Sequence, residues 1–231
     1  MKKMRKLIFI LLIIILVPVG AVVASGYRTY REALKRQPLS EAVRELTGIE
    51  NYTTVEEIPE IYLQAVVATE DRRFYLHGGF DPIGTLRAII TDIKERELKE
   101  GGSTITQQLA KNMYFEMDNS LNRKIAEIFM AIKLESEYSK EEILEFYING
   151  IYYGSGYYNV HDAAVGYFDK TPADMTDYEC TLLAGIPNAP SMYSLKVNPD
   201  LAKKRQEKVV QCMTDVEYIS EEEAEEILAG N

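Results

Sequence analysis

Residues 59–81, PEIYLQAVVATEDRRFYLHGGFD, decide the fold, because a long apolar segment runs there into a cluster of charges. Pro59 suits the first turn of a helix that is apolar on nearly every side, so we expect this helix to be buried. Glu70 falls at its C-terminal end, where the macrodipole is negative and water is scarce, and both effects raise the pKa of a carboxyl group. The stretch predicts either a general base at the end of a buried helix or an ion-pair cluster that only caps it.

The remaining sequence indicates an all-α, mostly helical domain, because no strand alternation of any length is present. Gly101-Gly102 opens one helix, Pro187 stops another, and a charged helical segment over 199–228 closes the chain. The helix that begins after Asp81 is expected to continue to about Glu97. The residues expected to cap helices are Asp81, Ser103, Ser120 and Ser139.

The N-terminus combines basic residues with a long uncharged stretch over 7–27 that is mostly Leu, Ile and Val. About 20 such residues cross a bilayer, whereas the apolar core of a signal peptide usually has about 7–15. We therefore expect a single transmembrane anchor over 7–27, with a cleaved signal peptide as the alternative. The basic tail, 1–6, should stay in the cytoplasm. Residues 28–57 are then a membrane-proximal segment, and 58–231 form the exported domain.

The net charge excludes one class of partner. The sequence has 26 Lys and Arg against 36 Asp and Glu, a formal net charge of −10, and four of the cations lie in the N-terminal tail. The exported part is therefore near −14 (22 cations against 36 anions), which argues against nucleic acid and requires a local cationic pocket for any large anionic substrate. Cys180 and Cys212 could pair in an oxidising compartment, but the apolar run CTLLAGI favours a buried thiol at Cys180.

A second polar motif is GGSTITQQLAKN, residues 101–112. On a helix, Gln107, Gln108 and Lys111 lie on one side, because their spacings are three and four residues. Amides suit sugar hydroxyls or carbonyls, an ammonium group suits an anion, and the helix N-terminus after the glycines is itself an anion site. The alternative is the exposed polar face of an ordinary amphipathic helix.

A third motif, RKIAE at residues 123–127, places two cations beside one glutamate. Arg123 and Lys124 lie four and three residues before Glu127, so both pairs can meet on a helix. A solvent-exposed salt bridge is the simple explanation. Together with Glu70, however, two glutamates with cationic neighbours suggest glycosyl chemistry, in which carboxylates move protons and cations hold a phosphate leaving group.

These motifs, in this order and spacing, resemble the peptidoglycan glycosyltransferases, the family 51 murein polymerases. The resemblance covers roughly residues 56–215 and includes KEEILEFYINGIYYG (140–154) and LLAGIPNAPSMYS (182–194). Since the sequence contains no Ser-x-x-Lys motif of a penicillin-sensitive transpeptidase, the chain resembles a monofunctional transglycosylase. Residues 58–231 would be its peptidoglycan glycosyltransferase domain.

The resemblance implies a lysozyme-like large lobe, a smaller and partly hydrophobic jaw that dips into the outer leaflet, and lipid II as the substrate. The 4-hydroxyl of an incoming lipid II would attack the growing lipid-linked chain, forming a β-1,4 linkage with inversion and releasing undecaprenyl pyrophosphate. Glu70 would be the general base, and Glu127 would orient the sugars or assist near the pyrophosphate, which Lys111 and Arg123 would hold. The residues expected to bind substrate are Ser103, Gln107, Gln108, Lys111, Arg123 and Lys124.

Other residues that match the family are expected to be architectural: Asp71, Phe74, His77, Gly79, Asp81, Glu142, Tyr147 and Asn149. The sequence departs from the family pattern at Asn119, where an arginine is common, and at Asp169, where glycine is usual. A further departure is His161-Asp162 in an otherwise apolar turn. The two histidines, His77 and His161, have no ligand-spaced partner, which argues against zinc. Acidic residues near a pyrophosphate still leave room for a divalent cation, Mg²⁺ or Mn²⁺, without a fixed motif.

The expected partners are lipid II, the growing glycan chain, the membrane and other cell-wall synthesis proteins. A membrane-anchored lytic enzyme of lysozyme type and a non-catalytic cell-wall scaffold are the alternatives. A glycoside hydrolase holds its two carboxyl groups about 5–9.5 Å apart. A polymerase must seat a whole acceptor sugar, so we predict a larger separation between Glu70 and Glu127.

Overall fold

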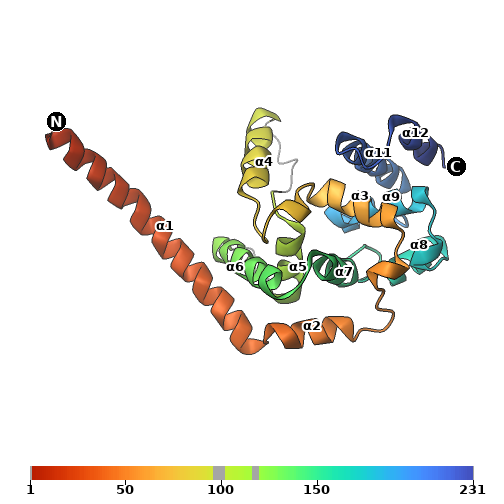
Figure 1. Ribbon diagram of the computed structural model, residues 1–231, viewed down its shortest axis with the longest axis horizontal. Coiled ribbons are helices and arrows are strands. Elements are labelled where there is room, and N and C mark those ends of the chain that lie inside the picture. Colours follow the sequence, from red (N-terminus) through yellow and green to blue (C-terminus); the bar gives the residue numbers. More distant parts are fainter. Residues whose placement is uncertain (1, 96–101, 116–119, 231) are drawn as a thin grey trace.

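The computed structural model describes residues 2–95, 102–115 and 120–230, and every regular element among them is a helix (Figure 1). The all-α prediction is therefore confirmed. Short 3-10 helices connect some of the longer ones: η1 (Val55–Glu57), η2 (Phe74–Leu76), η3 (Pro172–Asp174) and η4 (Ile186–Asn188). The α-helices are α1 (Lys2–Arg36), α2 (Leu39–Thr47), α3 (Glu60–Glu70), α4 (Pro82–Glu95), α5 (Ile105–Tyr114), α6 (Leu121–Glu137), α7 (Lys140–Gly150), α8 (Val160–Phe168), α9 (Asp177–Gly185), α10 (Pro190–Tyr193), α11 (Pro199–Asp215) and α12 (Glu221–Ala229).

The N-terminal helix α1 projects away from the rest of the molecule and turns sharply into α2 at Pro38 (Figure 1). It runs without a break through the boundary expected at residue 27. Its segment Leu12–Arg36 is the one helix in the described part that is long and apolar enough to cross a membrane, a test that a signal sequence also passes. The C-terminal part of α1 packs on α6. At Gly26 the two helices approach so closely that an added Cβ would lie 2.4 Å from Cβ of Ile125.

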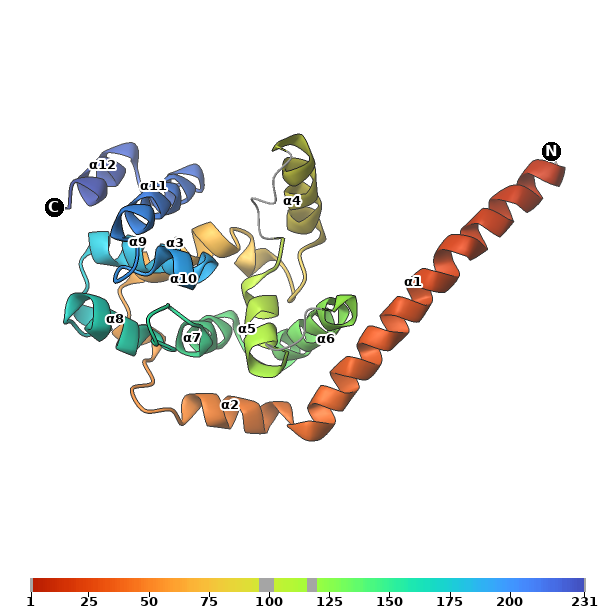
Figure 2. The same cartoon turned by 180° about the vertical axis from the view of Figure 1, so that it is seen from behind.

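The core is built around α3, as its apolar sequence predicts. Tyr62 and residues 65–68 are buried, and α3 packs against α9 on one side and α11 on another (Figure 2). Helix α5 packs against α6 and α7. Glu70 is the last residue of α3, so the buried helix delivers this side chain to the place where α3 meets the loop that precedes α4.

Three of the four expected helix caps are confirmed, and one is wrong. The hydroxyls of Ser120 and Ser139 accept hydrogen bonds from the third residue of α6 and α7, and Asp81 accepts one from the backbone of Ile83 at 3.0 Å. Helix α5 is capped by Thr104 and not by Ser103. Thr104 forms a reciprocal capping box with Gln107, in which each side chain bonds the backbone N–H of the other, at 3.1 and 3.0 Å.

Some sequence expectations fall on residues outside those described, namely the helix positions near Glu97, the glycine at 101 and the departure at Asn119. The other departure, Asp169, ends α8 with φ 58°. Glycine adopts this left-handed conformation without strain, and aspartate tolerates it better than most residues. The glycine usual at this position in the family therefore has a conformational reason.

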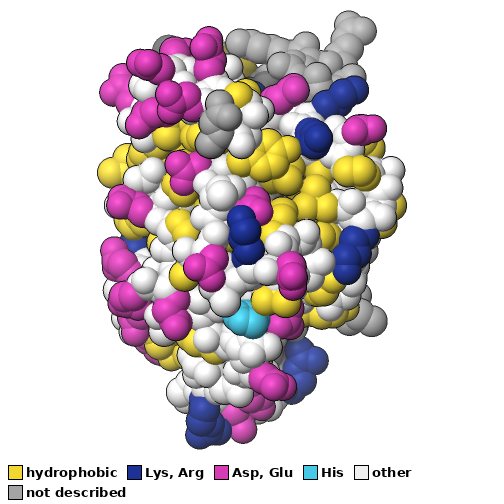
Figure 3. Space-filling view, turned by 90° about the vertical axis from the view of Figure 1, so that its right-hand side faces the viewer, with side chains coloured by type: hydrophobic (Ala, Val, Ile, Leu, Met, Phe, Trp, Pro, Cys, Tyr) yellow, Lys and Arg dark blue, Asp and Glu magenta, His cyan; other side chains and the backbone are white. Residues whose placement is uncertain are grey.

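The C-terminal segment over 199–228 is helical, as expected, and consists of two helices, α11 and α12, with Glu217 in a left-handed conformation (φ 61°) between them. Cys180 and Cys212 are both buried and free, as the apolar sequence around Cys180 favours. Acidic side chains are more widespread than basic ones on the face drawn in Figure 3, in keeping with the negative net charge.

Helix α7 holds the connection between α2 and α3. The side-chain amide of Asn149 binds both backbone groups of Thr53, accepting from its N–H at 3.0 Å and donating to its carbonyl at 2.7 Å. The carboxylate of Glu145 accepts hydrogen bonds from the Tyr52 hydroxyl and the Val55 N–H, at 2.7 and 2.9 Å. The expected packing role of Asn149 behind the site therefore has a specific form: it fixes the chain that leads into α3.

Candidate functional site

The two carboxylate oxygens of Glu70 differ: one accepts a hydrogen bond and the other has none among the described residues. Its side chain is about 10% exposed at the end of α3. The amide nitrogen of Gln108, on α5, donates to Oε2 of Glu70 at 2.8 Å. The guanidinium of Arg205, on α11, lies 3.8 Å from Oε1, and this oxygen accepts no hydrogen bond from any described group. Oε1 is thus a buried carboxylate oxygen whose capacity to accept a hydrogen bond is unused among the described residues.

The surroundings of Glu70 raise its pKa above the ordinary glutamate value. Burial is the main cause, and the negative charge of Asp71 adds to it. The hydrogen bond from Gln108 and the positive charge of Arg205 act in the opposite direction, but they do not cancel the effect of burial. The expected rise in the pKa of this buried carboxyl is confirmed, and it makes Glu70 a stronger base than a solvated carboxylate.

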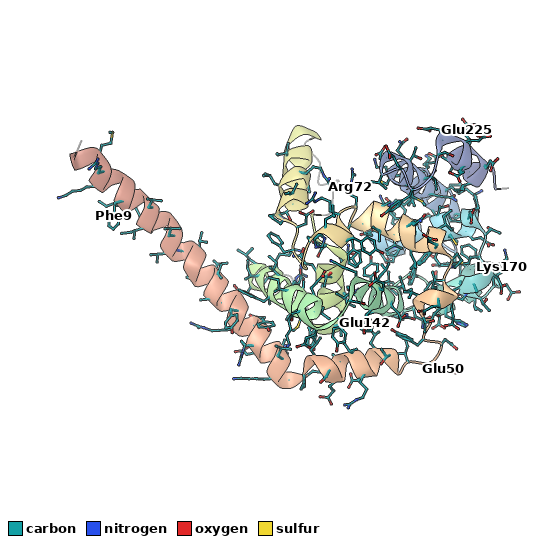
Figure 4. The ribbon with its side chains drawn as sticks, viewed as in Figure 1. Phe9, Glu50, Arg72, Glu142, Lys170 and Glu225 are labelled. Atoms are coloured by element: carbon teal, nitrogen blue, oxygen red, sulfur yellow. The ribbon has the colours of Figure 1, made fainter. Side chains whose placement is uncertain are left out.

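Glu70 opens onto a pocket of about 120 Å³ between the end of α3, the first turns of α4, residues 102–104 and α11. Three cations line it without an ion pair to a carboxylate of the described residues, Arg72, Arg87 and Lys208, and Arg205, which is paired with Glu70, lines it as well. Arg72 extends beside α4 where α3 ends (Figure 4). The acidic protein therefore contains the local cationic pocket that a large anionic substrate requires.

The loop from Asp71 to Asp81 and the start of α5 form one bonded unit. The carboxylate of Asp71 contacts Nε2 of His77 at 2.9 Å and accepts from the backbone N–H of Ile105 at 3.1 Å. The Thr104 hydroxyl donates to the carbonyl of Gly79 at 2.8 Å. These contacts support the architectural roles expected for Asp71, His77 and Gly79, and they fix α5 relative to the end of α3.

The three residues expected on one side of α5 have three different surroundings. Gln107 is buried and its side-chain oxygen is used in the capping box. Gln108 binds Glu70, and Lys111 is partly exposed and has no ion pair with a carboxylate of the described residues. Gln108 and Lys111 can therefore face a ligand, whereas Gln107 acts through the cap of the helix.

Glu127 is the centre of a second charged cluster, on α6. Arg123 and Lys124 lie 2.9 and 3.1 Å from its two carboxylate oxygens, so both ion pairs expected from the helix spacing are present. The Glu127 side chain is only 1% exposed, which rules out the solvent-exposed salt bridge considered as the simple explanation. Lys124 also donates to the hydroxyl of Ser103.

Ser103 connects the two clusters. It lines the pocket of Glu70 and binds Lys124, which in turn pairs with Glu127. The structure thus brings Glu70, Gln108, Ser103, Lys124 and Glu127 into one continuous array. The separation between the Glu70 and Glu127 carboxylates stays a prediction.

Comparison with known proteins identifies the family. A sequence model described as transglycosylase matches residues 38–214. The chain belongs to the transglycosylase family. The monofunctional glycosyltransferase of Staphylococcus haemolyticus is similar to this transglycosylase, with 39% identity over an alignment of 238 residues that covers 99% of the chain and 85% of that protein.

Penicillin-binding proteins are similar over the same region. Penicillin-binding protein 1A of Aquifex aeolicus is 43% identical over 175 residues, 76% of this chain. Penicillin-binding protein 2D of Bacillus subtilis is 46% identical over 166 residues, 72% of this chain. This transglycosylase spans about a quarter, 24%, of the length of each of these two proteins.

Sequence reasoning missed Arg205 and Lys208 near Glu70, and it gave Tyr147 only an architectural role. The first two belong to a highly charged helix, α11, in which no local pattern distinguishes a cation that points into a pocket from one on the surface. Tyr147 is fully buried, and its hydroxyl donates to Oε1 of Gln108 at 3.3 Å. An aromatic residue in an apolar helix indicates packing, and the sequence gives no signal for this polar contact.

The described side chains contain no preformed metal site. Among them, no group of three or more His, Cys, Asp or Glu residues is arranged to hold a metal ion. Asp71 is bonded to His77 and Ile105, and Glu127 is paired with two cations, so neither carboxylate is available as a metal ligand without breaking these contacts.

Proposed function

We propose that this chain polymerises lipid II into the glycan strands of peptidoglycan, by inverting β-1,4 glycosyl transfer with release of undecaprenyl pyrophosphate. One observation carries the proposal: Glu70 lines a cation-lined pocket, and one oxygen of its buried carboxylate accepts no hydrogen bond from the described residues. The family match and the similarity to a monofunctional glycosyltransferase support the same reaction.

Glu70 is the proposed general base. It would take the proton from the 4-hydroxyl of the acceptor lipid II while that oxygen attacks the anomeric carbon of the growing chain. Gln108 binds Oε2 and leaves Oε1 for the hydroxyl. Because burial raises the pKa of Glu70, the carboxylate holds the transferred proton more strongly than a solvated one would. General-base catalysis of this kind contributes roughly 10²–10⁴ in rate.

The pyrophosphate of the donor chain is proposed to bind Lys111 and Arg123, with Lys124 supporting them. Glu127 holds Arg123 and Lys124 through ion pairs of 2.9 and 3.1 Å, so these cations need little rearrangement when the substrate arrives. Cations placed in advance beside the leaving group stabilise the negative charge that develops there. In this proposal Ser103 and Gln108 position the donor sugars, and Gln107 keeps the start of α5 in place.

The cations around the Glu70 pocket give the proposal a second anion site. Arg72, Arg87 and Lys208 lie around the pocket that Glu70 faces, whereas Arg123 and Lys124 belong to the α6 cluster. Polymerisation brings together two substrates that each carry a diphosphate, and two cationic clusters suit this requirement. A hydrolase needs only one substrate and a water molecule, so the second cluster favours the polymerase over the lysozyme-type alternative.

Attachment to the membrane is part of the proposal. Helix α1 would anchor the chain with its basic end in the cytoplasm, which places the catalytic domain outside. On α4, Ile83, Leu86 and Ile90 are exposed and lie on one helical face. This apolar face would enter the outer leaflet as the jaw, where the lipid chains of both substrates are found.

The test is to give the purified full-length protein, in detergent or vesicles, labelled lipid II and to separate the products. Lengthening glycan chains support the proposal, shortening of preformed glycan indicates a lytic enzyme, and unchanged substrate with retained binding indicates a scaffold. A phosphoglycolipid of the moenomycin type, which mimics the donor, should block polymerisation.

Substitution at the two ends of α3 tests the role of Glu70. Glu70→Gln should abolish polymerisation while the helical circular dichroism spectrum is unchanged. Glu60→Gln is the matched control, because Glu60 is exposed at the first turn of the same helix. Undiminished polymerisation by Glu70→Gln would remove Glu70 from the role of base.

A further inference from the structure

The side-chain amide of Gln108 lies between two groups of different charge. Its nitrogen donates to Oε2 of Glu70 at 2.8 Å, and its oxygen accepts from the hydroxyl of Tyr147 at 3.3 Å. An amide has a donor end and an acceptor end, and an ionised carboxylate accepts only, so the two contacts satisfy the amide in one orientation. Gln108 is on α5 and Tyr147 is on α7, so this orientation depends on the packing of two helices.

The Tyr147 hydroxyl is suited to act as a permanent donor. Its side chain is fully buried. Burial raises the pKa of Tyr147 well above the ordinary tyrosine value, and the negative charge of Glu70 adds to this effect. The hydroxyl therefore keeps its proton around neutral pH. A hydroxyl that donates to the oxygen of an amide also polarises it, which strengthens the hydrogen bond given by the amide nitrogen.

We propose that Tyr147 is a positioning residue for the reaction: it fixes the amide of Gln108 with the nitrogen toward Glu70 and thereby favours the ionised form of the base. This inference rests on the proposed function of Glu70 and adds a residue that never touches the substrate. Without the Tyr147 hydroxyl, the amide can turn its oxygen toward Glu70. In that orientation the amide oxygen accepts a hydrogen bond from the O–H of a protonated carboxyl group, which favours the protonated, inactive form of Glu70.

Other groups also act on Glu70, and they do not depend on Tyr147. Asp71 follows it in the chain, Arg205 approaches Oε1 from α11, and Arg72 and Lys208 line the same pocket. Their charges stay the same when a buried hydroxyl on α7 is removed. A change in the titration of Glu70 after such a substitution therefore reports on the amide of Gln108.

The experiment is a pH–rate profile of lipid II polymerisation by the full-length protein. Tyr147→Phe should move the acid limb of kcat/KM to higher pH by about half a unit or more, which lowers the rate about threefold at acidic pH, while the plateau at higher pH stays near that of the wild type. Gln108→Ala should move the limb at least as far. The double variant should match Gln108→Ala alone, because Tyr147 acts through that amide.

Tyr153→Phe is the matched control. Tyr153 is also fully buried, and its hydroxyl contacts Tyr62 at 2.6 Å and the carbonyl of Ile148 at 3.2 Å, with no contact to Gln108. It should leave the acid limb unchanged. The proposal is overturned if Tyr147→Phe lowers the plateau without moving the limb, if Tyr153→Phe moves the limb equally, or if Tyr147→Phe has a further effect in the Gln108→Ala background.

A titration that needs no turnover separates this proposal from the proposed function. Carbon NMR of carboxyl-labelled glutamate, with Glu70→Gln to assign the signal, follows the protonation of Glu70 directly. An upward shift of its midpoint in Tyr147→Phe supports the positioning role even in a variant with low activity, and an unchanged midpoint refutes it. A wild-type protein that makes no polymer refutes the function instead.

Discussion

Replacing Gly79 by alanine should destabilise the protein by about 3 kcal/mol. Gly79 has φ 88°, and a Cβ added there would lie 2.7 Å from the carbonyl carbon and oxygen of Ala131, on α6. A left-handed conformation costs alanine about 1–2 kcal/mol, and crowding against backbone atoms that cannot rotate away costs about 1–3 kcal/mol. The reduced entropy of the unfolded chain offsets up to about 1 kcal/mol of this sum.

The assay is thermal unfolding of the full-length protein in detergent, followed by circular dichroism at a fixed scan rate. For a chain of this size, about 3 kcal/mol corresponds to a fall in Tm of about 6–12 °C. The neighbouring Gly78 is the control, because a Cβ there would meet nothing within 4 Å and its φ is not in the left-handed region. Gly78→Ala should change the free energy of unfolding by less than about 1 kcal/mol, and we expect the change to be a small increase. Equal changes in Tm for the two variants would refute the assignment of the strain to Gly79.

Three further predictions concern charge and helix packing. Burial raises the pKa of Glu70, so this carboxyl stabilises the fold only while it is protonated and loses that contribution as the pH rises through its folded pKa. In urea unfolding at pH 7, Glu70→Gln should therefore be more stable than the wild type, by about 1.4 kcal/mol for each unit by which the pKa of Glu70 is raised. An equal difference in stability at pH 4 would contradict this. Burial opposes ionisation of Asp81, but its backbone hydrogen bonds and Arg73 outweigh burial and lower its pKa. Asp81→Asn should therefore lose about 1–3 kcal/mol of stability at pH 7, and its difference from the wild type should shrink as the pH falls below the ordinary aspartate pKa of 3.8. A stability difference that persists in acid would count against an ionised Asp81 as the helix cap. Gly26→Leu should push α1 away from α6, at a cost of about 1–3 kcal/mol in stability, and should slow lipid II polymerisation. Gly20→Leu on the same helix is the control: no atom lies within 4 Å of a Cβ added at Gly20, so this variant should keep the wild-type rate.

The parts of the fold that depend on local pattern could be predicted from the sequence. The apolar run from 61 to 68 predicts the buried helix α3, and the spacing of Arg123, Lys124 and Glu127 predicts both ion pairs. The cap of α5 was also within reach. Thr104 has a glutamine three residues later and so completes a capping box, whereas the residue three after Ser103 is a threonine. Two neighbouring hydroxyl residues made the choice ambiguous, and the box rule would have decided it.

The parts of the site that depend on long-range packing could not be predicted in this way. Arg205 reaches Glu70 because α11 packs on α3, and no property of the sequence around either residue reports that contact. The burial of Gln107 likewise follows from the position of α5 between α6 and α7. Helix spacing shows which residues share a side of a helix, but it does not show which part of that side another helix covers.

If α1 spans the bilayer as proposed, its close crossing with α6 connects the surrounding lipid to the proposed catalytic site. A transmembrane helix adapts to a thinner or thicker bilayer by changing its tilt. Because no side chain fits between Gly26 and Ile125, a change in the tilt of α1 passes directly into the helix that carries Arg123 and Lys124. In the proposed function, acyl-chain length would then affect how these cations meet a diphosphate, so vesicles of different thickness should give different polymerisation rates at one concentration of lipid II.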